Sequence, residues 1–220
     1  MPKTYDKQTG AFLGTVAECM PDLPSSVMQG WVENPLFLAR ILKSLHPWCD
    51  KEVWRFNCAL PCSKEAHFMD QIFQKERDGK ITLGFWGKKL FEAVFYKVPK
   101  WDGEYSTVRL KLKELGFTEN VMLCDFKKRA RQFGLIECPH FVAYHYRLRY
   151  EKQPLHEHLY ILTESVVLSD GELSLFGLTH LPVENAKTHQ VQSRLWLDGH
   201  HGEANFLWSP DTEWVFALKE

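Results

Sequence analysis

Three histidines in the C-terminal third of the chain have a spacing that predicts a metal site. His156 and His158 are separated by one residue, and His201 follows later. On a regular strand, residues at i and i+2 point to the same face, so both imidazoles would face one ion. Two such imidazoles with a third histidine suit Zn, Fe or Mn. The pattern approaches the cupin metal motif, although Glu164, its carboxylate, falls on the opposite strand face. Exposed histidines on an edge or loop are the alternative.

A second group of candidate metal ligands lies earlier in the chain. Zinc sites usually combine one close pair of ligands with a second pair further along. The spacing here, HxxC followed by CxxxC and one more histidine, only approximates that arrangement. The alternative is that the cysteines are small apolar core residues. A structural zinc site is therefore one of two interpretations of His46, Cys49, Cys58, Cys62 and His67.

Basic side chains form the third group. The chain carries a net charge of −1, but residues 97–152 carry +5 and residues 153–220 carry −7. If the strands and helix of the first segment pack side by side, their cations would make one phosphate-binding patch. Tyr144, Tyr146 and Tyr150 would add stacking surfaces for bases. A solvated charged face, covered in cis by the acidic segment, is the alternative. The patch comprises Arg109, Lys111, Lys113, Lys127, Lys128, Arg129, Arg131, Arg147 and Arg149.

Several classes of protein are not indicated. The sequence has no GxGxxG fingerprint, no P-loop and no GxSxG elbow. No apolar run approaches the roughly 20 residues that span a bilayer. Residues 1–14 lack the apolar stretch of a signal peptide, so the six cysteines indicate reduced thiols. These observations predict a cytoplasmic protein without a membrane partner and favour a non-catalytic role.

The elements that would position these residues predict an α+β fold in three regions. Residues 1–47 read as an N-terminal helical segment, with a helix over 34–45 that begins at Asn34 and Pro35. Residues 48–100 read as a small mixed α+β region. Residues 101–220 read as an α+β domain in which an antiparallel sheet carries one packed basic helix.

The last region has the clearest periodicity. Val108, Leu110 and Leu112 alternate with basic residues, which predicts a half-buried strand. A helix is expected from about residue 120 to Gly134, and Gly171 belongs to a hairpin turn signal. Further strands are predicted over 143–150, 157–168, 172–178, 193–199 and 213–218.

A string of short motifs also runs through this half of the chain. It resembles the pattern LGFT, ELCP, RLxYxxQPxxEWL, SDGD and WVF of a family of uncharacterised proteins from uncultivated, candidate-phylum bacteria. The resemblance implies one recurring architecture and carries no assigned activity. The family pattern has tryptophan at the position of His158. The matching residues include Leu115-Gly116-Phe117-Thr118, Cys138-Pro139, Arg147, Tyr150, Gln153-Pro154, Glu157, Ser169-Asp170-Gly171 and Trp214-Val215-Phe216.

Two functions therefore follow as hypotheses. The first is a non-catalytic binding or interaction module whose basic strand–helix surface holds nucleic acid or an acidic protein. The second is a cupin-like metal-binding protein or metalloenzyme that uses the His-x-His strand.

Overall fold

The chain divides into two compact units, Met1–Cys49 and Asp50–Glu220. The computed structural model describes isolated positions of the first unit and residues 51–57, 65–95, 104–184 and 189–218 of the second. The described positions of the first unit are helical except for Pro24. Thr15 Oγ1 donates a hydrogen bond to the Ala11 carbonyl oxygen, one turn earlier, at 3.1 Å.

Two predictions concern residues outside the described part of the chain. One is the helix over 34–45. The other is the zinc site, because His46, Cys49, Cys58 and Cys62 all lie outside it and the side chain of His67 is not described.

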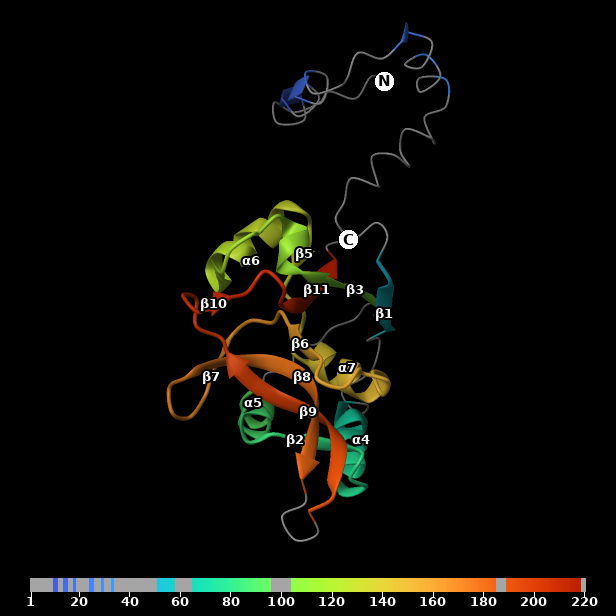
Figure 1. Cartoon of the computed structure of the whole chain (residues 1–220), viewed down its shortest axis with the longest axis vertical. Helices are drawn as coiled ribbons and strands as arrows, with labels where there is room; N and C mark the ends of the chain where they lie inside the picture. Colours follow the sequence, from blue (N-terminus) through green and yellow to red (C-terminus); the bar gives the residue numbers. More distant parts are fainter. Residues whose placement is uncertain are drawn as a thin grey trace. The chain divides into compact units, whose positions relative to one another are not determined.

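In the described part of the second unit, helices are interleaved with strands as far as α7, and only strands follow (Figure 1). Its described helices are α4 (Glu65–Arg77), α5 (Phe85–Phe95), α6 (Leu123–Gln132) and α7 (Phe141–Arg149), with the short 3-10 helix η1 (Leu112–Leu115). Its described strands are β1 (Val53–Asn57), β2 (Ile81–Leu83), β3 (Glu104–Lys111), β4 (Val121–Met122), β5 (Leu135–Ile136), β6 (His158–Ile161), β7 (Val166–Val167), β8 (Leu173–Glu184), β9 (Val191–His201), β10 (Leu207–Trp208) and β11 (Glu213–Leu218).

Most of these strands form one sheet, with the order β1-β3-β11-β6-β8-β9-β2 in the described part of the chain. The sheet is mixed, so the prediction of an antiparallel sheet is wrong. β11 runs parallel to β6, and β2 runs parallel to β9. The last strand inserts between β3 and β6, and it is antiparallel to β3 and to β5 but parallel to β6. Alternation of apolar residues carries no information about strand direction, which explains the error. The middle region contributes β1 and β2 to this same sheet.

The turn glycines sit where the predictions placed them. Gly134 follows α6 with φ +73°, and Gly171 lies between β7 and β8 with φ +87°. Both values lie in the left-handed region that glycine adopts without a steric cost. The predicted basic helix and the hairpin signal are therefore confirmed.

The strand predicted over 143–150 is helix α7, so that prediction is wrong. The sequence pattern predicts a strand here because Tyr144 and Tyr146 alternate with His145 and Arg147. In the structure Ala143 and Arg147, one helical turn apart, are both buried, as is Tyr146. The segment packs against β8 and β9 through side chains and makes no backbone ladder with them, so its buried residues follow helical spacing.

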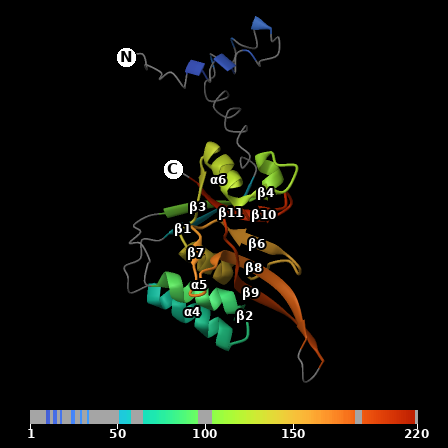
Figure 2. The ribbon, with the colours of Figure 1, turned by 90° about the vertical axis from the view of Figure 1, so that its left-hand side faces the viewer.

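Helices pack on both faces of the sheet. Ile161, Val215 and Ala217 belong to a core that also contains Leu90 of α5 and Tyr146 of α7. Trp214 and Phe216 alternate with Val215 and Ala217 and point to the opposite face, where the Phe126 ring of α6 lies 4.8 Å from the Trp214 ring. Figures 1 and 2 both place α6 at the opposite end of this unit from α4 and α5. No helix among the described residues is long and apolar enough to cross a membrane.

Helix α5 packs closely against the backbone of β9. A Cβ atom on Gly87 would lie 2.4 Å from the Leu197 carbonyl oxygen, so only glycine permits this approach. The residue before the helix, Gly84, has no side chain to cap the helix. Instead Asp198 Oδ1 accepts a hydrogen bond from the Gly87 N–H at 2.7 Å. A carboxylate from β9 thus accepts the hydrogen bond that an N-cap side chain usually accepts.

We predict that Asp198→Ala lowers the free energy of unfolding by about 1 kcal/mol, the usual cost of losing an N-cap. Urea denaturation followed by circular dichroism measures this. Asp211→Ala is the matched control, since Asp211 is exposed and pairs only with exposed Lys113. Equal effects of the two substitutions would contradict the assignment of Asp198 as the cap of α5.

Candidate functional site

A guanidinium group lies in the core of the second unit. Arg147 of α7 is 0% exposed. Its Nη1 donates to Gln153 Oε1 at 2.6 Å and to the Trp196 carbonyl oxygen at 3.4 Å, and its Nη2 donates to the Tyr150 carbonyl oxygen. Burial lowers the pKa of Arg147 to about 10. The side chain therefore stays charged near neutral pH and needs every one of these acceptors.

Gln153 connects this arginine to the sheet. Its Nε2 donates to the Glu157 carbonyl oxygen at 3.2 Å and to the Leu178 carbonyl oxygen at 3.1 Å. The backbone carbonyl oxygen of Gln153 accepts a hydrogen bond from His180 Nδ1 at 2.6 Å. One buried amide thus joins the end of α7, the start of β6 and the middle of β8.

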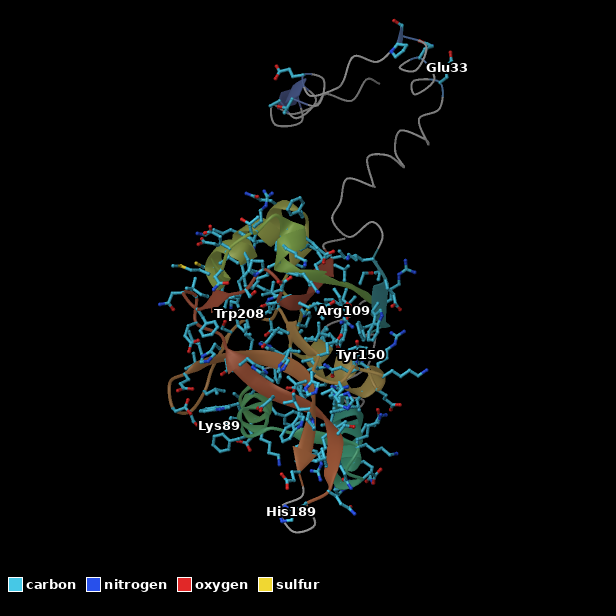
Figure 3. The ribbon with its side chains drawn as sticks, viewed as in Figure 1. Glu33, Lys89, Arg109, Tyr150, His189 and Trp208 are labelled. Atoms are coloured by element: carbon cyan, nitrogen blue, oxygen red, sulfur yellow. The ribbon has the colours of Figure 1, made fainter. Side chains whose placement is uncertain are left out.

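A second arginine closes the network at the surface. Arg109 Nη2 donates to Glu157 Oε1 at 2.8 Å and to Glu213 Oε2 at 2.9 Å. Its guanidinium lies 4.8 Å from the centre of the Tyr150 ring, and the Tyr150 hydroxyl donates to Glu157 Oε1 at 3.1 Å. Figure 3 shows Arg109 and Tyr150 as neighbours. Burial alone would lower the pKa of Arg109, but its hydrogen bonds to Glu213, Tyr150 and Glu157 outweigh burial and raise it.

We call this set the arginine network: Arg109, Arg147, Tyr150, Gln153, Glu157 and Glu213. It contains two guanidinium groups and two carboxylates, so its formal charges balance, although both carboxylates contact Arg109 and Arg147 donates to neutral oxygens. Glu157 Oε2 is buried and has no hydrogen-bond partner among the described residues. The arrangement connects the end of α7 to β3, β11, β8, β9 and the start of β6, and it offers one carboxylate oxygen that can accept a further hydrogen bond.

Sequence reasoning did not predict this network. Four of its members lie in one motif, RLRYEKQPLHE, which ends at Glu157. That motif could have indicated part of the network, but Glu213 and Arg109 lie far from it in the chain. They lie on the paired strands β11 and β3, and β11 also pairs with β6, which follows the motif.

The predicted basic surface does not form as a whole, and Arg109 and Lys113 are paired with carboxylates. Arg147 is a correction, because it lies in the core and not on a surface. Arg109 is held by two carboxylates, and Lys113 pairs with Asp211 at 2.8 Å. Lys111 lies opposite Glu213 in the strand register. Arg149 is exposed at the end of α7 and donates to the Arg55 carbonyl oxygen at 3.2 Å.

The cations of α6 keep most of their exposure. The side chains of Lys128 and Arg131 are 72% and 58% exposed, and they meet Asp125 and Glu137 respectively. Arg129 is exposed as well, yet its guanidinium meets only neutral oxygens, those of Leu115 and Gln132. Lys127 is 16% exposed and is paired with Glu137. The helix therefore carries more positive charge than its own carboxylates neutralise.

The tyrosines expected to stack on bases face inward. Tyr144 and Tyr146 are 7% and 0% exposed, because α7 turns them into the core. Tyr146 stacks on Trp54 with a centroid distance of 4.6 Å. Tyr150 belongs to the arginine network. The stacking hypothesis is therefore wrong for Tyr144 and Tyr146, whereas Tyr150 is partly exposed and has the Arg109 guanidinium over its ring.

The three candidate metal-ligating histidines lie in different settings. His156 precedes β6 and has φ +66°, so strand alternation does not relate it to His158, which begins β6. His201 ends β9 and stacks on Phe206 at 4.2 Å. In the parts of the chain that the structure describes, no three His, Cys, Asp or Glu side chains are grouped to hold a metal ion.

Two other histidines are partly buried and neutral. His145 of α7 packs edge-on to Phe56 and Phe141, with ring centroids 5.7 Å apart in both cases. His200 of β9 packs edge-on to Tyr160 at 4.9 Å. Burial lowers the pKa of each imidazole to about 4.

Comparison of the chain with protein-family models, with curated proteins and with solved structures finds no match. The function is therefore inferred from the charges and contacts of the residues described above. The fold and the site describe an α+β protein with a charge-balanced interior network and one cationic helix surface.

We predict that Arg147→Met lowers the free energy of unfolding by about 3 kcal/mol or more. The substitution leaves Gln153 Oε1 and the Tyr150 carbonyl oxygen buried without a donor. Arg149→Met is the matched control, because that arginine is exposed two residues later on the same helix. Guanidinium denaturation measures both. A loss below 1 kcal/mol for Arg147→Met would show that the core does not depend on this group.

We also predict that acid destabilises the folded state well above pH 4. A neutral buried imidazole with a pKa near 4 binds protons less readily than the unfolded chain, whose histidines titrate near 6.5. Stability is therefore fully present above pH 6.5 and falls as the pH drops toward 4. Each histidine contributes about 2 kcal/mol of this loss by pH 5.

Urea denaturation at pH 7, 6, 5 and 4 measures the slope. The double variant His145→Gln, His200→Gln removes both titrations, so its stability should depend less on pH in this window. An unchanged slope in the double variant would contradict the assignment.

Proposed function

We propose that this protein is a non-catalytic binding module that holds a polyanionic partner, nucleic acid or an acidic protein, on the exposed side of α6. We call this side the α6 surface and define it by Lys128, Arg129 and Arg131. One observation carries the proposal: Arg129 is exposed on this helix and meets no carboxylate in the described part of the chain. Arg109 and Lys113, by contrast, are paired with carboxylates of the chain itself.

The local setting keeps this charge in place. Phe126 anchors the inner side of α6 on Trp214, and Leu123 and Ala130 are buried on the same side. The Arg129 guanidinium lies 4.7 Å from the centre of the Phe133 ring, which orients the arginine. A rigid helix that presents several cations can contact successive phosphates or carboxylates with little loss of side-chain entropy.

The ion pairs on α6 are compatible with exchange. Lys128–Asp125 and Arg131–Glu137 are surface pairs, which contribute little to stability. A partner anion that replaces the helix's own carboxylate therefore displaces a weak interaction. The interaction with a partner should weaken steeply with salt, because it releases counterions.

The test is charge reversal on the α6 surface, with Lys128→Glu, Arg129→Glu and Arg131→Glu combined. The probes are a fluorescent DNA duplex, a single-stranded RNA and polyglutamate, each titrated at several salt concentrations. We expect the affinity for the preferred probe to fall on the order of a hundredfold and the salt dependence to shrink.

The matched control reverses three exposed cations elsewhere, Arg77, Lys88 and Lys152. This control makes the same change in net charge and should retain most of the affinity. An equal loss in both variants would indicate attraction by net charge alone. Full binding by the α6 variant would overturn the proposal.

A further inference from the structure

The β8–β9 hairpin extends beyond the helices at its far end (Figure 2). Hydrogen bonds near its middle show which way the backbone of β8 faces. The His180 N–H donates to the Glu157 carbonyl oxygen at 3.2 Å, and the His180 carbonyl oxygen accepts from the His156 N–H at 2.7 Å. Both groups of His180 therefore point away from β9.

Backbone direction alternates along an antiparallel pair, so the rest of the hairpin follows. His180 pairs with Leu195, whose groups must point away from β8, toward β2. The Gly84 N–H donates to the Leu197 carbonyl oxygen at 3.0 Å, which agrees with this direction. Two and four residues earlier on β9, Ser193 and Val191 point the same way.

No described strand pairs with this part of β9. β2 covers only Leu195–Leu197, and the N–H groups of Asp78, Gly79 and Lys80, just before β2, donate back to carbonyl oxygens of α4. The N–H and C=O groups of Val191 and Ser193 thus form an open sheet edge. Val191 is 66% exposed, which is unusual for an apolar β-branched residue.

The two edges of the hairpin differ. On β8 the corresponding outward positions are Pro182 and Glu184, which pair with Ser193 and Val191. Proline has no N–H, so it cannot donate to an added strand, and proline is a common protection for exposed edges. β9 carries no such protection at its open end.

Two cations lie beside the open edge, whereas the nearby carboxylate of Glu184 accepts a hydrogen bond from His189 Nδ1 at 2.7 Å. Arg194 is exposed and forms no ion pair with any described residue. Lys80 immediately precedes Ile81, which pairs with Leu195, so Lys80 lies next to Arg194 along the edge. The Lys80 side chain is 66% exposed, and its distance to Asp78 Oδ2 is 3.9 Å. A second copy of this chain would bring the same cations to the seam, which disfavours self-association here.

We propose that an acidic peptide segment adds as an extended strand to the open edge of β9 at Val191–Ser193, in line with β2. Backbone hydrogen bonds to Val191 and Ser193 would hold it, and Arg194 and Lys80 would select acidic side chains. This surface is separate from the α6 surface and does not depend on it.

The experiment uses the full chain and a fluorescent heptapeptide that alternates glutamate with valine, followed by anisotropy. We expect binding that weakens about tenfold in Ser193→Pro, which removes one outward N–H, and weakens similarly in Arg194→Glu. Gln192→Ala is the matched control, because its backbone groups face β8, and it should bind normally. A heptapeptide with N-methylated valines should bind poorly to the unmodified chain, which tests the edge even if Ser193→Pro does not fold.

Three results would overturn the proposal. The first is no binding of the glutamate–valine peptide to the unmodified chain, and the second is equal binding of a lysine–valine peptide. The third is a dimer in sedimentation that Ser193→Pro abolishes, which would assign this edge to a second copy. Charge reversal on the α6 surface should leave peptide binding intact, so failure of one proposal is distinguishable from failure of the other.

Discussion

The buried guanidinium of Arg147 is the constraint on which the middle of this structure depends. A cation in the core is tolerated only where acceptors surround it. Those acceptors come from Gln153 and from the backbone of Tyr150 and Trp196. The chain after α7 must therefore fold back against the end of its own helix before β6 begins. Gln153 then sets the spacing of β6 and β8 through two backbone carbonyl oxygens.

The same requirement explains how charge is distributed over the surface. Arg109 lies on the face of the sheet that carries the core, and it is stable there because Glu157 and Glu213 both reach it. Pairing of this kind neutralises Arg109. The helix α6 packs through its apolar side and extends its cations outward. Asp125 and Glu137 pair with Lys127, Lys128 and Arg131, but no described carboxylate reaches Arg129, so α6 keeps an excess of positive charge.

Most backbone N–H and C=O groups of the sheet also have partners within the described residues. The central strands have neighbours on both sides, and Asp198 of β9 caps the start of α5. Pro182 removes a donor from the β8 edge of the hairpin. The far end of β9 is where outward backbone groups meet neither a neighbouring strand in the described residues nor a residue that blocks pairing. Backbone groups left open in this way, beside Arg194, which has no ion pair with a described residue, are the features that a partner can recognise.

The sequence by itself determined the strand β3, the helix α6 and the turns at Gly134 and Gly171, because these depend on local periodicity and on glycine backbone freedom. It also contained the motif from Arg147 to Glu157, although not its meaning. Only the tertiary structure decided that α7 is a helix, because the burial of Ala143, Tyr146 and Arg147 depends on the strands they meet. It also decided strand direction and the neutralisation of Arg109. Those outcomes rest on contacts between residues about 50 to 100 positions apart, which local patterns of residue type do not encode.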